Sequence, residues 1–238
     1  MPPAIESDIP ADLLPLTLPH LGNRGTALEG LTLLVVEDSR FACDALRLMC
    51  QRSGARMRRA ESLRDARAHL RTYRPDAILV DLGLPDGRGE GLIRELALAG
   101  GPRRPVVLGM SGDPAGRGLA LAAGAAGFLD KPISSLVAFQ RKVQQHLPNP
   151  GADLAEDSVV TPDPLALHDD LAHAAALLAN RPQGPAREYL TGFVTGLARA
   201  THDPALEAAA KGDAALRTAL ATRLSVGLGP LINPQRSL

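Results

Sequence analysis

The stretch Leu31-Thr32-Leu33-Leu34-Val35-Val36-Glu37-Asp38-Ser39 places a mostly apolar run directly before two acids and a serine. A short run rich in leucine and valine predicts a central strand that is buried on both faces of a sheet. Ser39 is a helix-capping residue type, and apolar residues recur after it at helical spacing until Gly54. This stretch therefore predicts one β–α unit, with Glu37 and Asp38 where the strand ends.

The same alternation of apolar strand and amphipathic helix repeats along the chain. Further strands are predicted at residues 55–60, 77–80, 105–110 and 126–129, and further helices at residues 62–74, 91–99, 115–123 and 135–146. Glycine and proline residues separate these elements. Alternating strands and helices are typical of an α/β fold, here a doubly wound five-stranded parallel sheet. Ligands of such sheets bind in the crevice at the carboxyl ends of the strands.

Polar residues follow the carboxyl ends of four of these strands. They are Glu37 with Asp38, then Asp81, Ser111 and Lys131. These side chains are expected to converge, because the carboxyl ends of parallel strands share one edge of the sheet. Three nearby carboxylates raise one another's pKa unless a cation lies among them, and such oxygen ligands suit Mg²⁺, although they could also bind calcium. The added lysine and hydroxyl favour a site that holds a phosphoryl group.

Four segments together resemble the receiver domain of two-component response regulators, over residues 28–147. The segments are Val35-Val36-Glu37-Asp38-Ser39, Ile78-Leu79-Val80-Asp81-Leu82-Gly83-Leu84-Pro85-Asp86-Gly87, Met110-Ser111-Gly112 and Phe128-Leu129-Asp130-Lys131-Pro132. The resemblance implies a flavodoxin-like receiver fold with bound Mg²⁺. It also implies that a histidine kinase or a histidine-phosphotransfer protein donates the phosphoryl group.

The resemblance further implies a role for each matched residue. Asp81 is the expected phosphoacceptor. The expected magnesium ligands are Asp38 and Asp81, Glu37 acting mostly through a bound water, and the backbone carbonyl of Gly83. Lys131 is expected to pair with the phosphate, and the peptide bond that follows it is expected to be cis, which proline permits.

Ser111 and Phe128 resemble the switch residues of the family. Phosphorylation adds about 1.5 to 2 negative charges, so Ser111 would move inward and Phe128 would fill the vacated space. The face made by the fourth helix, the fourth strand and the fifth helix would then change shape, and partner proteins would bind this face. Taken singly, each residue also has a structural interpretation: Glu37 and Asp38 could cap a helix, Ser111 could belong to a turn, and Phe128 could be core.

The alternation of strands and helices is confined to residues 29–147, which are the predicted receiver. Residues 1–28 contain several prolines and are predicted to be an irregular arm, and residues 148–163 are a predicted linker. Residues 164–238 are predicted to form a small all-α bundle, since Asp203-Pro204 is typical of a helix start and leucines recur at helical spacing. The stripes are Leu167, Leu171, Ala174 and Leu178; Leu190, Phe193, Val194 and Leu197; and Leu216, Leu220 and Leu224.

Charge argues against a nucleic-acid partner. Residues 1–150 carry 19 basic and 16 acidic side chains, and the remainder carries 7 and 10. An acidic C-terminal region without a basic recognition helix is not typical of DNA binding. Two alternatives stay open: a transcriptional regulator with an unrecognised DNA-binding element, and a phosphorelay protein in which His168 or His173 exchanges a phosphoryl group with Asp81.

The function expected from these patterns is that of a bacterial response regulator, a switch rather than a turnover enzyme. Its bundle would bind an unknown downstream protein or form a homodimer. No stretch reaches the roughly 20 apolar residues that span a bilayer, and the first residues lack the pattern of a signal peptide. We therefore expect no membrane partner and a cytoplasmic location.

Overall fold

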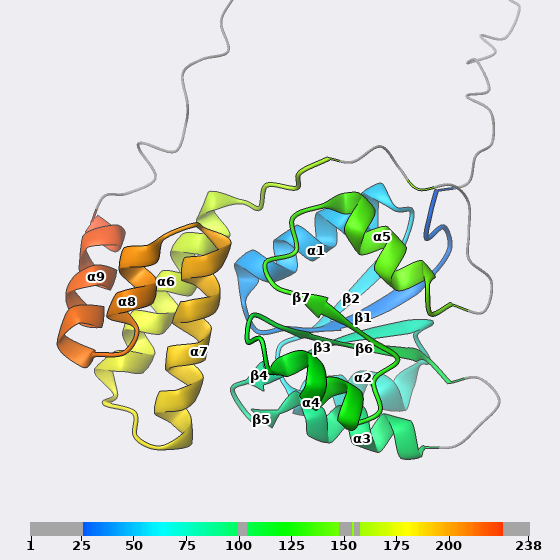
Figure 1. The fold of residues 1–238 in the computed structure, drawn as a ribbon, viewed down its shortest axis with the longest axis horizontal. Coiled ribbons are helices and arrows are strands. Elements are labelled where there is room, and N and C mark those ends of the chain that lie inside the picture. The colour runs from blue at the N-terminus through cyan, green and yellow to red at the C-terminus, as the bar shows by residue number, and fades with distance from the viewer. Residues whose placement is uncertain (1–25, 100–103, 148–153, 155–157, 226–238) are drawn as a thin grey trace, which may run out of the picture.

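The computed structural model describes residues 26–99, 104–147, 154 and 158–225, and it contains a parallel sheet followed by a group of helices (Figure 1). The strands of the sheet are β1 (Thr32–Val36), β2 (Arg56–Ala60), β3 (Ala77–Asp81), β6 (Val106–Ser111) and β7 (Gly127–Asp130). They lie in the order β2-β1-β3-β6-β7, and every neighbouring pair is parallel. The predicted doubly wound five-stranded sheet is confirmed.

Helices cover both faces of this sheet, as Figure 1 shows. They are α1 (Arg40–Arg52), α2 (Leu63–Thr72), α3 (Gly89–Leu98), α4 (Gly116–Ala122) and α5 (Leu136–Gln144). Leu33 and Val35 of β1 pack with α1 and α5, whereas Leu34 and Val36 pack with α2, α3 and α4. Because successive side chains of a strand point to opposite faces, the apolar run is buried on both sides, as predicted.

The two predicted serine caps are confirmed. The Oγ of Ser39 accepts a hydrogen bond of 3.0 Å from the backbone N–H of Ala42, and the Oγ of Ser62 accepts one of 3.1 Å from Asp65. Each satisfies a backbone donor that the first turn of a helix leaves free, which stabilises a helix by about 1 kcal/mol. α1 ends before Gly54, whose φ of +76° suits glycine.

A short hairpin after Asp81 was not predicted. β4 (Gly83–Leu84) and β5 (Gly87–Arg88) pair antiparallel, with Asp86 at the turn between them. The Asp86 carboxylate accepts hydrogen bonds of 2.9 and 3.0 Å from the backbone N–H groups of Leu63 and Arg64. The turn therefore supplies a second cap to the start of α2.

Two parts of the predicted flanking segments pack into the receiver. Ala27 and Leu28, which we assigned to the arm, are buried against α1 and α5, while residues 1–25 lie outside the described part of the chain. Val160, which we assigned to the linker, is buried in the same cluster, and its neighbour Val159 forms an isolated antiparallel bridge with Ser135. Apolar side chains at these positions extend the receiver core beyond its repeating units.

The C-terminal region is helical, as predicted. Its helices are α6 (Pro164–Ala179), α7 (Pro185–Ala200), α8 (Pro204–Ala209) and α9 (Asp213–Ser225), and residues 226–238 lie outside the described part. The predicted stripes contribute to its apolar core, whose buried members include Leu171, Leu190, Val194, Leu216 and Leu220. Among the described residues, no helix is both long enough and apolar enough to cross a membrane.

These helices, called the bundle below, lie against the receiver at the carboxyl edge of its sheet. In Figure 1, α7 is the bundle helix nearest to the strands. α6 contacts α1, and α7 contacts β4. Phe41 of α1 packs on the apolar core of the bundle. The bundle therefore touches the edge where the polar site residues were expected.

Candidate functional site

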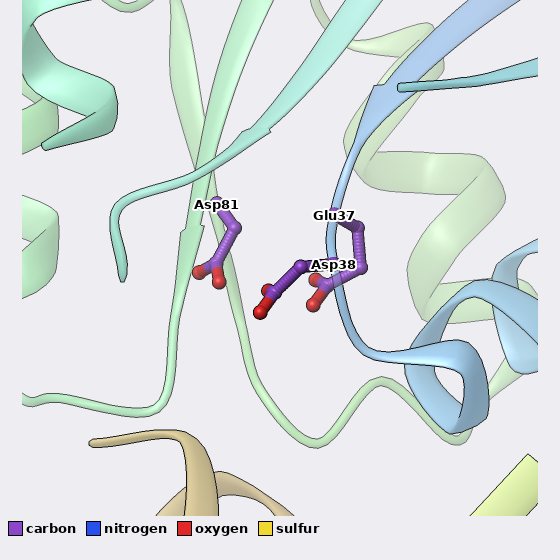
Figure 2. A group of neighbouring side chains, drawn as sticks. All are labelled: Glu37, Asp38 and Asp81. Atoms are coloured by element: carbon purple, nitrogen blue, oxygen red, sulfur yellow. The ribbon is translucent and has the colours of Figure 1, made fainter. Parts of the chain in front are cut away.

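Three carboxylates meet at the carboxyl edge of the sheet. Glu37 and Asp38 follow β1, Asp81 ends β3, and the two strands are neighbours with Val36 paired to Val80. One carboxylate oxygen from each residue lies within 4.8 Å of the others, and Figure 2 shows the three side chains pointing toward a common space. The convergence predicted from strand order is confirmed.

Lys131 lies directly beside this acidic cluster. Its Nζ is 2.5 Å from Oε2 of Glu37 and 3.2 Å from Oδ2 of Asp81. It follows β7, and its backbone N–H donates a 3.0 Å hydrogen bond to the carbonyl of Ser111. The Lys131–Pro132 peptide bond is cis, as predicted.

Burial and mutual repulsion shift the ionisation of the cluster. Burial raises the pKa of Glu37 to about 8, and Asp81 adds to this shift although Lys131 opposes it. Burial also raises the pKa of Asp38 to about 6, opposed by a hydrogen bond from Tyr189. Burial alone would lower the pKa of Lys131, but the charges of Asp81 and Glu37 raise it overall. The site thus gathers more negative charge than one lysine offsets.

The donor set fits a hard divalent cation. Mg²⁺ prefers oxygen ligands, usually one or two carboxylates together with water and phosphate oxygens. The three carboxylates provide such oxygens, and Gly83, the predicted backbone ligand, lines the same cleft two positions after Asp81. The predicted magnesium ligands are therefore brought to one place, and their binding role stays a prediction.

Gly89 fixes the position of the strand end that carries Asp81. A Cβ atom built on Gly89 would lie 2.1 Å from the backbone oxygen of Asp81 and 3.0 Å from the Cα of Leu82. The first turn of α3 can approach the end of β3 this closely only because residue 89 has no side chain. The close approach places the start of α3 against the backbone of Asp81.

The two predicted switch residues lie next to each other. A Cβ atom on Gly116 would be 2.8 Å from the Cβ of Ser111 and 3.2 Å from the Cζ of Phe128. The Oγ of Ser111 accepts a 3.0 Å hydrogen bond from the backbone N–H of Asp113, and Phe128 is 1% exposed. The structure therefore brings the pair together, and their movement on phosphorylation stays a prediction.

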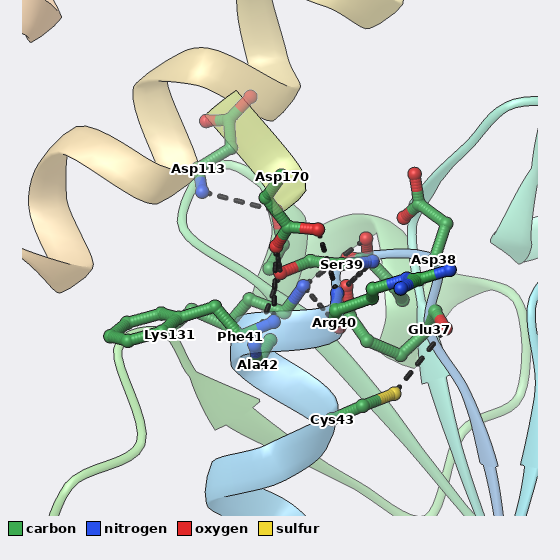
Figure 3. Close-up of polar contacts among 12 residues, drawn as sticks. Glu37, Asp38, Ser39, Arg40, Phe41, Ala42, Cys43, Asp113, Lys131 and Asp170 are labelled. Atoms are coloured by element: carbon green, nitrogen blue, oxygen red, sulfur yellow. Dashed lines mark hydrogen bonds and ion pairs between the residues drawn. The ribbon is translucent and has the colours of Figure 1, made fainter. Parts of the chain in front are cut away.

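Three bundle residues that the sequence analysis missed reach this site. Tyr189 of α7 donates a hydrogen bond from its hydroxyl to Oδ2 of Asp38. Asp170 of α6 contacts the start of α1 (Figure 3), and Arg199 of α7 donates a hydrogen bond to the backbone oxygen of Gly112. The bundle thus contacts both the loop after β1 and the loop after β6.

One of these residues carried a signal in the sequence. Asp170 follows Leu167 by three positions and precedes Ala174 by four, so it falls on the apolar stripe of its own helix. A carboxylate on a buried stripe needs a polar partner, and Asp170 is 3% exposed. The sequence positions of Tyr189 and Arg199 carry no comparable sign of a contact outside their own helix.

A cleft of about 750 Å³ separates the receiver from α7 around the acidic cluster. Receiver residues Asp81, Ser111 and Lys131 line one side, and Tyr189 and Arg199 line the other. Among the described residues that line this cleft there is no histidine, so neither His168 nor His173 faces Asp81 here. His173 is exposed and packs edge-on against Phe193, with ring centroids 5.6 Å apart.

Part of the chain is similar in sequence to known proteins. Residues 33–141 match the family model described as the response regulator receiver domain. The KDP operon transcriptional regulatory protein KdpE of Escherichia coli strain K12 is 33% identical over 127 residues, which are 53% of this chain and 56% of KdpE. The virulence transcriptional regulatory protein PhoP of Salmonella typhimurium is 44% identical over 61 residues, 26% of this chain and 27% of PhoP. The chain thus matches about half of KdpE and a quarter of PhoP.

Solved structures also resemble the receiver half. A response regulator structure from Chloroflexus aurantiacus is 27% identical, with a TM-score of 0.46 over 50% of this chain and 98% of the other. The receiver domain of the sensor histidine kinase PA1611 from Pseudomonas aeruginosa PAO1 is 26% identical, with a TM-score of 0.46 over 50% and 99%. That structure has a magnesium ion coordinated in its active site cleft.

Proposed function

Residues 33–141 are a response regulator receiver domain, and from this premise we propose that the chain is a phosphorylation-controlled switch that accepts a phosphoryl group on Asp81. The observation that carries the proposal is the position of Asp81, with its carboxylate 3.2 Å from Lys131 and beside two further acids. The donor would be the phosphohistidine of a histidine kinase or of a histidine-phosphotransfer protein.

In this proposal a carboxylate oxygen of Asp81 attacks the phosphorus as the bond to the donor's imidazole nitrogen breaks. Lys131 pairs with the transferred group and offsets its charge. Mg²⁺ held by Glu37, Asp38, Asp81 and the carbonyl of Gly83 would neutralise the phosphoryl oxygens and orient them. Ser111 then donates to a phosphoryl oxygen, and Phe128 follows it inward.

The bundle would carry the output, through binding of another protein or through dimerisation. Its contacts with both loops of the site support this assignment, because α6 and α7 are hydrogen-bonded to Ser39, Asp38 and Gly112, which lie around Asp81. The chain would act as a switch and not as a turnover enzyme, since its product is its own phosphorylated form.

A transcriptional role is the second candidate, because KdpE and PhoP are named as transcriptional regulators. Against it stands the net acidic charge of residues 151–238. Retention on DNA that falls steeply with added salt would favour this candidate. The absence of such retention would leave protein binding or dimerisation as the output.

The first test treats the protein with acetyl phosphate and Mg²⁺ and follows the intact mass. We expect one phosphoryl group on the natural chain and none on Asp81→Asn. Asp130→Asn is the matched control, because Asp130 is exposed and stands beside Lys131. Equal labelling of Asp81→Asn would refute the assignment of the acceptor.

A second test asks what the switch controls. Light scattering after size exclusion compares untreated protein, protein with beryllofluoride as a phosphoryl mimic, and treated Asp81→Asn. A change in mass that needs Asp81 would assign dimerisation to the bundle. An unchanged mass would assign regulated binding of a different protein.

A further inference from the structure

The backbone that carries the acidic pair is held by a residue of the bundle. Asp170 accepts hydrogen bonds from the Oγ of Ser39 at 2.7 Å and from the backbone N–H groups of Arg40 and Phe41 at 3.0 Å each. Figure 3 shows this carboxylate at the amino end of α1. Asp170 therefore anchors the three residues that directly follow Asp38, which limits the movement of the backbone that carries the Asp38 side chain.

The second contact reaches the Asp38 carboxylate itself. The Tyr189 hydroxyl donates to Oδ2 of Asp38, and the Tyr189 ring is held by Phe193, whose ring centroid is 5.9 Å away. A carboxylate has two oxygens and several lone pairs, so an oxygen of Asp38 stays available to a cation while Tyr189 is bonded to the other. Tyr189 therefore restricts the rotation of Asp38 and leaves the second carboxylate oxygen without a bond to Tyr189.

Outer hydrogen bonds of this kind orient metal ligands in many proteins, and their loss weakens metal binding. We propose that Tyr189 and Asp170 are positioning residues of the magnesium site, so that the receiver binds Mg²⁺ most tightly when the bundle is docked. This inference rests on the proposed function, because it takes Asp38 as a magnesium ligand. It adds that part of the site comes from residues outside the receiver.

Thermodynamic linkage makes the effect reciprocal. If the docked bundle favours Mg²⁺ binding, then Mg²⁺ favours the docked bundle by the same factor. The cleft between the receiver and α7 has a volume of about 750 Å³, so the docked bundle does not close the site off. Mg²⁺ would thus prepare the site and hold the bundle on it at the same time.

The test measures Mg²⁺ binding to the full chain by isothermal titration calorimetry. Tyr189→Phe removes only the hydroxyl, and we expect the dissociation constant to rise by about tenfold. Tyr73→Phe is the matched control, because the chain has only one other tyrosine and the Tyr73 hydroxyl has no hydrogen-bond partner within the described part. We expect Tyr73→Phe to bind Mg²⁺ like the natural chain.

A second readout separates positioning from a general loss of structure. Hydrogen exchange of the backbone N–H groups in residues 185–200 is measured with and without Mg²⁺. We expect Mg²⁺ to slow this exchange in the natural chain and in Tyr73→Phe, and to have little effect in Tyr189→Phe. The unfolding temperature without Mg²⁺ should differ little between the two tyrosine variants.

Two results would overturn the inference. An unchanged dissociation constant in Tyr189→Phe would mean that the hydroxyl does not position Asp38. A lower dissociation constant would mean that Tyr189 competes with the cation and that the docked bundle inhibits the site. Either result could coexist with normal labelling of Asp81, whereas failure of the natural chain to bind Mg²⁺ or to be labelled would refute the proposed function itself.

Discussion

The ammonium nitrogen of Lys131 lies 3.2 Å from the Oδ2 atom of Asp81, the predicted phosphoacceptor. The same nitrogen is 2.5 Å from Glu37, whose side chain is 1% exposed. Lys131 is therefore expected to contribute both to the stability of the fold and to phosphorylation of Asp81, and the two contributions can be measured separately. It balances a buried carboxylate, and it stands where a phosphoryl group on Asp81 would extend.

Replacing Lys131 by methionine should reduce both contributions. Loss of the charged hydrogen bond to Glu37 should lower the free energy of unfolding by about 2 kcal/mol, measured with urea. Labelling by acetyl phosphate should slow by about 100-fold, because a donor to the developing charge is lost. Lys211→Met is the control, since Lys211 is exposed and should change neither quantity. Labelling of Lys131→Met at the natural rate would contradict the assigned role.

Two glycines of α3 should respond oppositely to a methyl group. Gly89→Ala would place its Cβ 2.1 Å from the backbone oxygen of Asp81, so it should destabilise the fold by more than about 2 kcal/mol and slow labelling of Asp81. Gly91→Ala meets nothing within 4 Å and should be neutral or stabilise by up to about 1 kcal/mol. Urea unfolding distinguishes the two, and similar losses in both would refute the close approach.

Two neighbouring aspartates of α6 provide a matched pair. Asp170→Ala should cost about 2 kcal/mol of unfolding free energy, because it leaves two backbone donors at the start of α1 without an acceptor. Asp169→Ala breaks an exposed ion pair with Arg40 and should cost less than about 1 kcal/mol. Equal losses in the two variants would show that the buried hydrogen bonds of Asp170 contribute no more to stability than the exposed ion pair of Asp169.

Asp203 should make the stability of the bundle depend on acidity. Its carboxylate begins α8 and bonds Arg223 at 2.6 and 2.7 Å, and these hydrogen bonds hold its pKa below the ordinary value of 3.8. A carboxyl group with a lowered folded pKa contributes stability that is present above the unfolded value and is lost as pH falls through the folded value.

The matching variant is Asp203→Asn, which keeps a capping side chain but cannot ionise. The natural chain should exceed it in unfolding free energy by about 1 kcal/mol at neutral pH. This difference should shrink as pH falls below about 3.8, measured by urea titrations at several pH values. A difference that stayed constant down to the most acid condition would exclude the carboxylate as its source.

The receiver could be predicted from sequence because its determinants are local. The apolar runs before Glu37 and Asp81 define strands, and parallel strand order alone places their carboxyl ends together. The hairpin at residues 83–88 was missed, although Pro85-Asp86-Gly87 is a turn signal, because strands of two residues show no periodicity. The capping of α2 by Asp86 depends on tertiary contact and has no local signal.

The bundle was predicted as helices but not as part of the site. Periodicity identifies which face of α6 or α7 is apolar, and it does not say which residues at the border of that face touch another unit. Tyr189 and Arg199 act through contacts with Asp38 and Gly112, which are distant in sequence. Such contacts depend on how two folded units meet, so they could be found only in three dimensions.

The anchoring of Val160 in the receiver core limits how far the bundle can travel. Three residues separate Val160 from Pro164, where α6 begins, so a fully extended chain of four Cα-to-Cα steps holds these two residues within about 14 Å of each other. A tether this short keeps a detached bundle at an effective concentration on the order of millimolar around its own receiver. A detached bundle should therefore dock again on its own receiver more often than on the receiver of another chain at ordinary protein concentrations. A dimer in which two chains exchange their bundles would require Val160 to leave the core first.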